Sequence, residues 1–225
     1  MGLALLPFFE FFRGTPHQLA AIKELEQSVP EELLDEDADW FQAWKESGYD
    51  QQIYMPYFKQ LDNKTGTGYR ECFSSAAAMV AAFYKKVGTD DEYNKIRAKY
   101  GDTTSVEAQL AALRSLGLEA EFRKDGDSDM VELEIEAGRP VLVGWLHAGN
   151  MLRGEPPMCN GMGCGHWSVI SGYAGKNSND PEWIMEKGGH SNPHLGRNVR
   201  VRQAAFYQRW QSEGPKTGWV ILVNE

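Results

Sequence analysis

A single cysteine, Cys72, stands at the head of a run of small residues between positions 74 and 78. The run predicts a helix that begins at Cys72. The free N–H groups and partial positive charge of a helix N-terminus favour the thiolate, which is the nucleophilic form of cysteine. The small residues would also let a sheet pack close to the helix and bring a base near the sulfur. Cysteine is one of the most often buried residue types, however, so this segment alone favours a structural role.

His166 is the residue that could serve Cys72 as a base. It follows a glycine-rich loop and begins a predicted strand, "HWSVISGY", so its imidazole would lie at a sheet edge and could face a helix terminus. A thiolate–imidazolium pair needs a cysteine and a histidine that meet in space and not in sequence. The two residues together predict nucleophilic catalysis, with Cys72 as nucleophile and His166 as its base.

Gln60 precedes the cysteine, in "PYFKQLDN". Attack at a carbonyl creates an oxyanion that needs hydrogen-bond donors, and a glutamine amide together with the backbone N–H of the nucleophile can supply them. An isolated glutamine is usually a solvated surface residue. The prediction that Gln60 is an oxyanion donor therefore depends on the order Gln60, Cys72, His166.

The other two cysteines, Cys159 and Cys164, lie in the loop before the histidine, and the odd total of three excludes a fully paired disulfide set within one chain. With neighbouring histidines they could bind zinc. Their Cys-x4-Cys spacing is wider than the common Cys-x2-Cys, and a fourth ligand is undefined. A disulfide between them, or two free thiols, is therefore favoured, and we expect no metal and no cofactor.

Two of the seven tryptophans, Trp145 and Trp167, flank the proposed site. Trp145 ends an apolar run before the glycine-rich loop, and Trp167 directly follows the histidine. Tryptophan combines a large apolar surface with one polar N–H, so both side chains could line a substrate groove. The remaining tryptophans are more simply explained as core and rim residues.

From residue 53 onward the elements that must position these residues are mostly helices first and strands afterwards. Three consecutive helices are predicted near 72–86, 90–100 and 106–116, with Thr89 or Asp90 as the cap of the second. Strands are predicted at 118–123, 139–146, 166–173, 182–186 and 217–223, with short helices at 130–137 and 203–210. This order is the α+β pattern of helices packed on an antiparallel sheet.

Residues 1–52 form a compositionally distinct N-terminal extension before the predicted domain at 53–225. It carries an aromatic arm with four phenylalanines, Phe8, Phe9, Phe11 and Phe12, and then an acidic stretch that predicts two amphipathic helices broken at Pro30. Exposed phenylalanines are unfavourable in water unless another surface covers them. The arm therefore predicts a protein partner.

The charge balance excludes several classes of partner. A net charge of -9 and a pI near 5.1 argue against binding to nucleic acid or to an anionic membrane surface, because both need clustered basic side chains. No apolar stretch approaches the length of a membrane span, and the apolar N-terminus lacks the basic residues of a secretory signal. The sequence predicts a soluble protein.

The segments "MPYFKQLDN", "RECFSSAAAMVAAFY", "GRPVLVGWL" and "GHWSVISGY" resemble the papain-like cysteine peptidases of the bacteriocin-processing (family 39) type, particularly those encoded by bacteriophages. The resemblance covers residues 53–225. It implies a papain-like fold in which Cys72 is the nucleophile, His166 the general base and Gln60 the oxyanion donor. A phage origin would suggest a virion or tail enzyme that cleaves peptides, such as peptidoglycan cross-links of the host wall.

The sequence departs from this family after the histidine strand. Family members usually end the next strand in Asp-Pro, whose carboxylate orients the imidazole, whereas this chain has Glu186-Lys187-Gly188. Glu186 is the nearest carboxylate and is the predicted orienter, with Asn192 and Asp180 as further candidates. Loss of an oriented imidazole would cost orders of magnitude in rate. The alternative function is a structural tail or baseplate protein that uses a catalytically weakened papain-like scaffold as a docking module.

Overall fold

The structure is a computed structural model that describes residues 49–149, 151, 155–157, 164–188 and 196–225. The chain divides into two units, Met1–Ser47 and Gly48–Glu225, and the second contains every described residue. Several residues named above lie outside the described residues: the aromatic arm and helices of the extension, Cys159 and Asn192. The structural account below therefore concerns the second unit.

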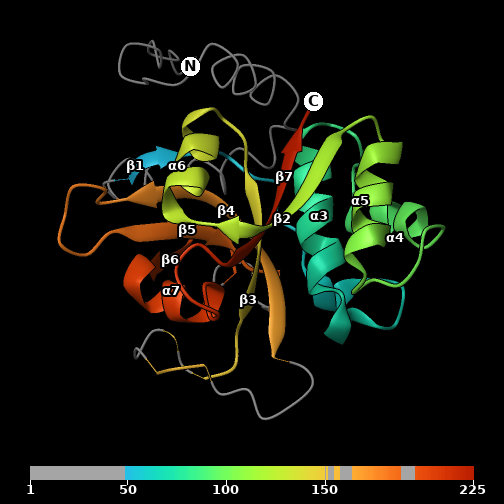
Figure 1. Cartoon of the computed structure of the whole chain (residues 1–225). Helices are drawn as coiled ribbons and strands as arrows, with labels where there is room; N and C mark the ends of the chain where they lie inside the picture. Colours follow the sequence, from blue (N-terminus) through green and yellow to red (C-terminus); the bar gives the residue numbers. More distant parts are fainter. Residues whose placement is uncertain (1–48, 150, 152–154, 158–163, 189–195) are drawn as a thin grey trace, which may run out of the picture. The chain divides into compact units, whose positions relative to one another are not determined.

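A seven-stranded antiparallel sheet forms the centre of this unit (Figure 1). Its strand order is β2-β7-β3-β4-β5-β6, and β1 pairs with β4 outside that path. The sheet brings the last strand of the chain between β2 and β3, so the C-terminal segment is part of the core. The strands are β1 (Tyr49–Gln52), β2 (Glu119–Gly126), β3 (Val141–Leu146), β4 (Gly165–Ala174), β5 (Glu182–Glu186), β6 (Val199–Arg202) and β7 (Gly218–Asn224).

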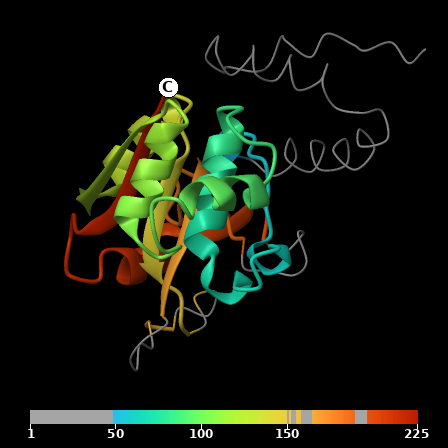
Figure 2. The ribbon, with the colours of Figure 1, turned by 90° about the vertical axis from the view of Figure 1, so that its right-hand side faces the viewer.

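Helices cover both faces of the sheet. In Figures 1 and 2, α3, α4 and α5 lie on one side, and α6 and α7 lie on the other. The helices are α3 (Cys72–Phe83), α4 (Asp90–Arg97), α5 (Val106–Ser115), α6 (Ser128–Glu136) and α7 (Gln203–Trp210), and two 3-10 turns precede them, η2 (Gln60–Asp62) and η3 (Gly68–Arg70). The α+β prediction is confirmed.

The predicted starts of the helices agree with the caps in the structure. The Thr89 hydroxyl accepts a hydrogen bond from the backbone N–H of Glu92, so Thr89 and not Asp90 caps α4. The Ser105 hydroxyl accepts one from the N–H of Ala108 in the same way, at the start of α5. Each cap supplies an acceptor for an N–H group that the helix leaves without a partner.

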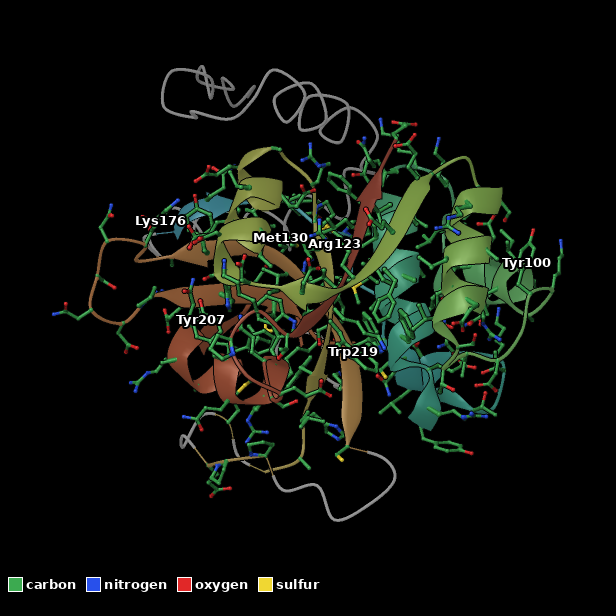
Figure 3. All side chains as sticks on the ribbon, viewed as in Figure 1. Tyr100, Arg123, Met130, Lys176, Tyr207 and Trp219 are labelled. Atoms are coloured by element: carbon green, nitrogen blue, oxygen red, sulfur yellow. The ribbon has the colours of Figure 1, made fainter. Side chains whose placement is uncertain are left out.

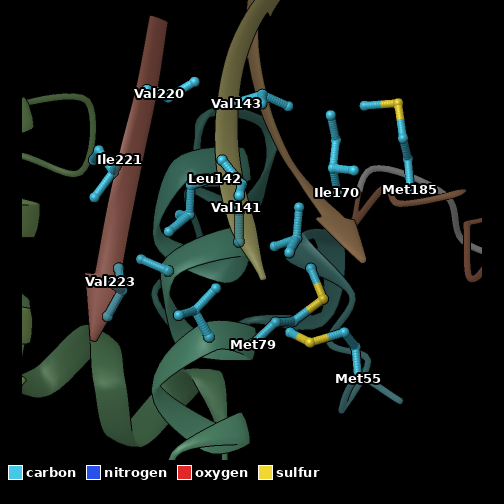
Figure 4. Close-up of a cluster of buried hydrophobic side chains, with 14 of the residues drawn as sticks. Met55, Met79, Val141, Leu142, Val143, Ile170, Met185, Val220, Ile221 and Val223 are labelled. Carbon is cyan, nitrogen blue, oxygen red and sulfur yellow. The ribbon is translucent and has the colours of Figure 1, made fainter. Parts of the chain in front are cut away.

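The core lies between α3 and the central strands (Figure 4). Ala76, Ala77 and Ala78 are almost fully buried, so the small residues of α3 lie in the interior as predicted. Aliphatic side chains of β3, β4 and β7 fill the space around them, among them the cross-strand neighbours Leu142, Val169 and Ile221. Tight packing fixes α3 against the sheet, and it thereby fixes the position of the residue that begins the helix.

Candidate active site

Cys72 is the first residue of α3 and carries a free, half-buried thiol. Burial raises the pKa of the thiol above its ordinary value, although backbone N–H groups of Trp167, Phe73 and Cys72 itself act in the opposite direction. The helix N-terminus was predicted to favour the thiolate. In the structure, loss of hydration acts against this effect.

An aromatic stack holds the cysteine end of α3 against β4. The rings of Phe73 and Trp167 are parallel within 4° and their centroids lie 3.9 Å apart. Gly144, opposite Trp167 on β3, makes room for the indole, because a Cβ at this position would lie 3.0 Å from the Trp167 ring. Through this stack, the strand that carries the histidine packs against the first turn of α3.

His166 is the residue next to that contact, at the start of β4. It pairs with Trp145 on β3, and its ring packs edge-to-face on the indole at 5.6 Å between centroids. Burial lowers the pKa of His166 to about 3, and the positive charges of His147 and Lys187 contribute to the decrease. Within the described part of the chain, no hydrogen bond joins the imidazole to the Cys72 thiol. Trp167 faces α3, so alternation along β4 turns His166 to the other face of the sheet, where the neutral imidazole is favoured.

Gln60 is buried beside the loop that leads into Cys72. Its side-chain Nε2 donates to the carbonyl of Gly68 at 3.1 Å, and its own backbone N–H donates to the carbonyl of Gly188 at 2.8 Å. Gly68 approaches so closely that a Cβ there would lie 2.3 Å from the Gln60 carbonyl oxygen. Gln60 is thus not the solvated residue that an isolated glutamine usually is, and an amide has a second N–H to offer. Its role as oxyanion donor stays a prediction.

Glu186 lies in a different environment from the imidazole. It is fully buried at the end of β5, where it accepts hydrogen bonds from the Ser171 hydroxyl at 3.2 Å and from the backbone N–H of Asn198 at 3.1 Å. It pairs with Val169, three residues from His166 along β4. Side chains alternate between the two faces of a strand, so an odd separation places the carboxylate and the imidazole on opposite faces. The structure therefore does not bring Glu186 to His166.

Lys187, the next residue, is the one that faces the imidazole. Its Nζ lies 5.3 Å from the centroid of the Trp145 ring, the same ring on which His166 packs. Lys187 had no predicted role. Strand alternation identifies Lys187 once the face of Glu186 is known, because the residue after a buried carboxylate points to the other face. The third predicted orienter, Asp180, forms an ion pair with Arg202 at 3.1 Å and is more than half exposed.

Replacing Glu186 with glutamine is expected to change the pH dependence of stability. Burial is the main cause that raises the pKa of Glu186 from 4.5 to about 7. The unfolded chain therefore ionises at lower pH than the folded one, and the free energy of unfolding falls as pH rises through this interval. The variant should lack this decrease and be more stable at pH 8, by up to roughly 3 kcal/mol.

Urea denaturation of both proteins at pH 4.5, 6, 7 and 8 measures this difference. Asp90, whose pKa burial raises to about 6, contributes a similar slope in both proteins and cancels in the comparison. A variant with the same pH profile as the parent would show that Glu186 ionises normally in the folded protein.

A cavity of about 260 Å³ adjoins the imidazole. Both predicted groove residues, Trp145 and Trp167, line it, together with Trp219, which is labelled in Figure 3. Trp145 is nearly fully buried, and its indole N–H donates to the Ser168 hydroxyl at 3.1 Å. Trp219 is 39% exposed and therefore offers apolar surface to a bound molecule. Substrate binding by these tryptophans stays a prediction.

Cys164 is disulfide-bonded. The zinc alternative would need its thiolate; among the residues that the structure describes, no group of three or more histidine, cysteine, aspartate or glutamate side chains is arranged for a metal ion, and Cys159 lies outside them. In the same part of the chain, no helix is long and apolar enough to cross a membrane.

Comparison with known proteins gives structural matches only. No family model matches the sequence, and the search of curated proteins found no match either. The fold matches a C39-like peptidase from Bacillus anthracis with a TM-score of 0.54 at 14% identity, over 78% of this chain and 98% of that one. A double glycine motif protease from an AMS/PCAT transporter, in complex with its leader peptide, matches with a TM-score of 0.48 at 20% identity, over 77% and 94%. The described domain has the papain-like peptidase fold.

Proposed function

We propose that this protein is a cysteine peptidase or amidase in which Cys72 attacks an amide carbonyl and His166 transfers the proton. One observation carries the proposal: in a papain-like fold, Phe73, the neighbour of Cys72 at the N-terminus of α3, stacks at 3.9 Å on Trp167, the residue that follows the histidine. The nucleophile and the base thus lie at the same end of β4, and alternation along the strand turns His166 to the face opposite Trp167.

The first step is nucleophilic attack by Cys72. The sulfur attacks the carbonyl carbon while its proton moves to the imidazole, which acts as a general base. The resulting oxyanion would accept hydrogen bonds from the Cys72 N–H and the second amide hydrogen of Gln60. His166 then gives the proton to the leaving amine and a thioester remains. Water attacks the thioester, His166 accepts its proton, and the carboxylic acid leaves as the sulfur regains a proton.

The proposed substrate is a peptide. The sequence resemblance supports a narrower version, an enzyme of a phage virion or tail that acts on peptidoglycan peptides, with the extension at 1–52 binding another virion protein. The alternative, a tail or baseplate docking module with weakened catalysis, gains support from Lys187, since a cation faces His166 where an orienting carboxylate would be expected.

Cleavage of a peptide mixture tests the proposal directly. A proteome-derived peptide library is incubated with the protein and with Cys72→Ala, and new termini are identified by mass spectrometry. We expect a set of new termini that depends on Cys72, because the variant lacks the attacking sulfur. The same result for a library of peptidoglycan stem peptides would support the narrower substrate. No Cys72-dependent cleavage in either library would favour the docking module.

A further inference from the structure

The loop between Gln60 and Cys72 exposes two large apolar side chains. Among the residues that the structure describes, five large apolar side chains are exposed, and this loop carries two of them, Leu61 at 52% and Tyr69 at 78%. Leu61 directly follows the predicted oxyanion donor, and Tyr69 lies three residues before the nucleophile. We call these two residues the apolar pair. A single exposed apolar residue is ordinary on a protein surface, but two beside a candidate nucleophile indicate a binding surface.

The backbones of the apolar pair come together beside α3. Gly68, which precedes Tyr69, packs on the backbone of Leu61, since a Cβ on Gly68 would lie 3.0 Å from the Leu61 Cα. The Gln60 Nε2 donates to the Gly68 carbonyl at 3.1 Å and closes the loop at this point. The turns that hold the pair, η2 and η3, contact each other and also contact α3.

Polar side chains hold this loop in place. The Asn63 Nδ2 donates to the Gln60 carbonyl at 3.1 Å and to the Ser75 hydroxyl of α3 at 3.2 Å. The Thr67 hydroxyl donates to the buried Glu71 carboxylate at 2.7 Å. Because these bonds fix the backbone before a ligand arrives, little conformational freedom is lost when the apolar pair is covered.

The charges of the loop favour an apolar ligand group over an anionic one. Its two cations already have partners, since Lys64 pairs with Asp91 at 3.5 Å and Arg70 with Asp102 at 3.0 Å. Exposed ionic contacts contribute little free energy, whereas covering apolar surface contributes in proportion to the area removed from water. The apolar pair is therefore the feature of this loop that can contribute most to binding.

A peptide attacked at Cys72 would lie along the apolar pair. Tyr69 and Cys72 are three residues apart across a 3-10 turn that leads into α3, in which the Glu71 N–H donates to the Gly68 carbonyl at 3.1 Å. Residues three apart in such a turn lie on the same side. Consecutive Cα atoms of a peptide are about 3.8 Å apart, so the residues that flank the attacked bond come within side-chain reach of this loop.

We propose that Leu61 and Tyr69 bind an apolar side chain of the substrate peptide next to the scissile bond. The inference rests on the proposed function and narrows its substrates to peptides with an aliphatic or aromatic residue at one of the two positions that flank the cleaved bond. Leu61 and Tyr69 are then specificity-determining residues that take no part in the chemistry. Their loss reduces the preference among substrates and leaves the attack itself unchanged.

Two neutral alkylating reagents test this surface without knowledge of the substrate. Iodoacetamide and N-benzyliodoacetamide have the same reacting group, but only the second carries an apolar ring near it. With each, the sulfur–carbon bond forms, iodide leaves and the thiol proton is lost to solvent. Rates are measured at pH 7.5 under non-reducing conditions, and peptide mapping assigns the adduct to Cys72. The ratio of the two rate constants cancels any change in the intrinsic reactivity of the thiol, and the ratio for glutathione gives the value without a binding surface.

We expect the parent protein to favour the benzyl reagent about tenfold more than glutathione does, because the ring is bound before the sulfur attacks. Leu61→Ser and Tyr69→Ser should each lower this preference by about threefold, since each removes apolar area. Tyr69→Phe keeps the ring and should keep the preference. Leu133→Ser is the matched control for Leu61→Ser, because Leu133 is 64% exposed on α6, on the other side of the sheet (Figure 1). All three positions are exposed, so the variants should stay folded, which circular dichroism checks.

An equal preference in the parent and in both serine variants would overturn the apolar surface. Sedimentation velocity of the same proteins identifies a different occupant. A parent that forms dimers, serine variants that do not, and an unchanged reagent preference would assign the apolar pair to contact between two copies of the chain and overturn its role in substrate binding.

Failure of the proposed function is a separate result. A reagent preference that is lost in the serine variants, without any Cys72-dependent peptide cleavage, would support the apolar surface and reject the peptidase. Cys72-dependent cleavage with no apolar preference next to the cleaved bond would retain the peptidase and reject the surface.

Discussion

His166→Ala is expected to lower kcat/KM for a cleaved peptide by about 10³-fold, because the variant has no group that accepts the thiol proton and returns it to the leaving amine. The measurement is a progress curve for one peptide identified in the library experiment, at several pH values. The residual activity of the variant should rise with pH, since hydroxide increasingly replaces the base and more of the Cys72 thiol ionises.

Tyr100→Ala, which changes an exposed aromatic side chain that the site does not use, provides the control and should keep the parent rate. Circular dichroism and the Tm of His166→Ala separate loss of the base from loss of the fold. Unchanged kcat/KM in a folded His166→Ala protein would remove the histidine from the mechanism, and the docking module would become the better description.

Arg209→Met is expected to lower the free energy of unfolding by about 3 kcal/mol. Arg209 is 1% exposed, and its guanidinium donates to three backbone carbonyls, of Leu146, Ala148 and Glu155, at 3.0, 2.7 and 2.7 Å. Methionine fills a similar volume but has no donor, so three carbonyls lose their partner. The effect is measured by urea denaturation at pH 7.

Arg139→Met is the comparison for this change. Arg139 also makes two hydrogen bonds, but to the Glu134 carboxylate in a pair whose arginine is one-third exposed. Water can replace such a partner, and we expect a loss of no more than about 1 kcal/mol. Equal losses for the two variants would mean that the bonds of Arg209 to the loop after β3 contribute nothing beyond an ordinary ion pair.

Local sequence signals predicted most of the elements and part of the site, but not the short strands β1 and β6. The small residues after Cys72 predicted a buried helix, and α3 begins at the cysteine itself. The apolar run at 139–146 predicted a buried strand, and β3 occupies the middle of the sheet. These predictions succeed because propensity, capping and hydrophobic pattern act within a few residues.

Local sequence signals could not predict that Lys187 faces the imidazole of His166. Glu186 is the nearest carboxylate in sequence, but which side it occupies depends on its pairing with β4, and this pairing contains an irregularity between Ile170 and Gly172. A shift of one residue exchanges the two faces, so Glu186 and Lys187 would change places. The burial that raises the pKa of Cys72 could not be predicted from local sequence either, because it arises from packing against β4, almost one hundred residues away.

The close approach of Trp167 to Gly144 restricts the substitutions that both positions can accept. The indole of Trp167 fills the space that a side chain at position 144 would need. Trp167 in turn stacks on Phe73, the residue after Cys72. An alanine at 144 would push on Trp167 and, through Phe73, on the first turn of α3. Positions 144 and 167 are therefore expected to covary. A larger residue at one position would be accepted only when the other position holds a smaller residue.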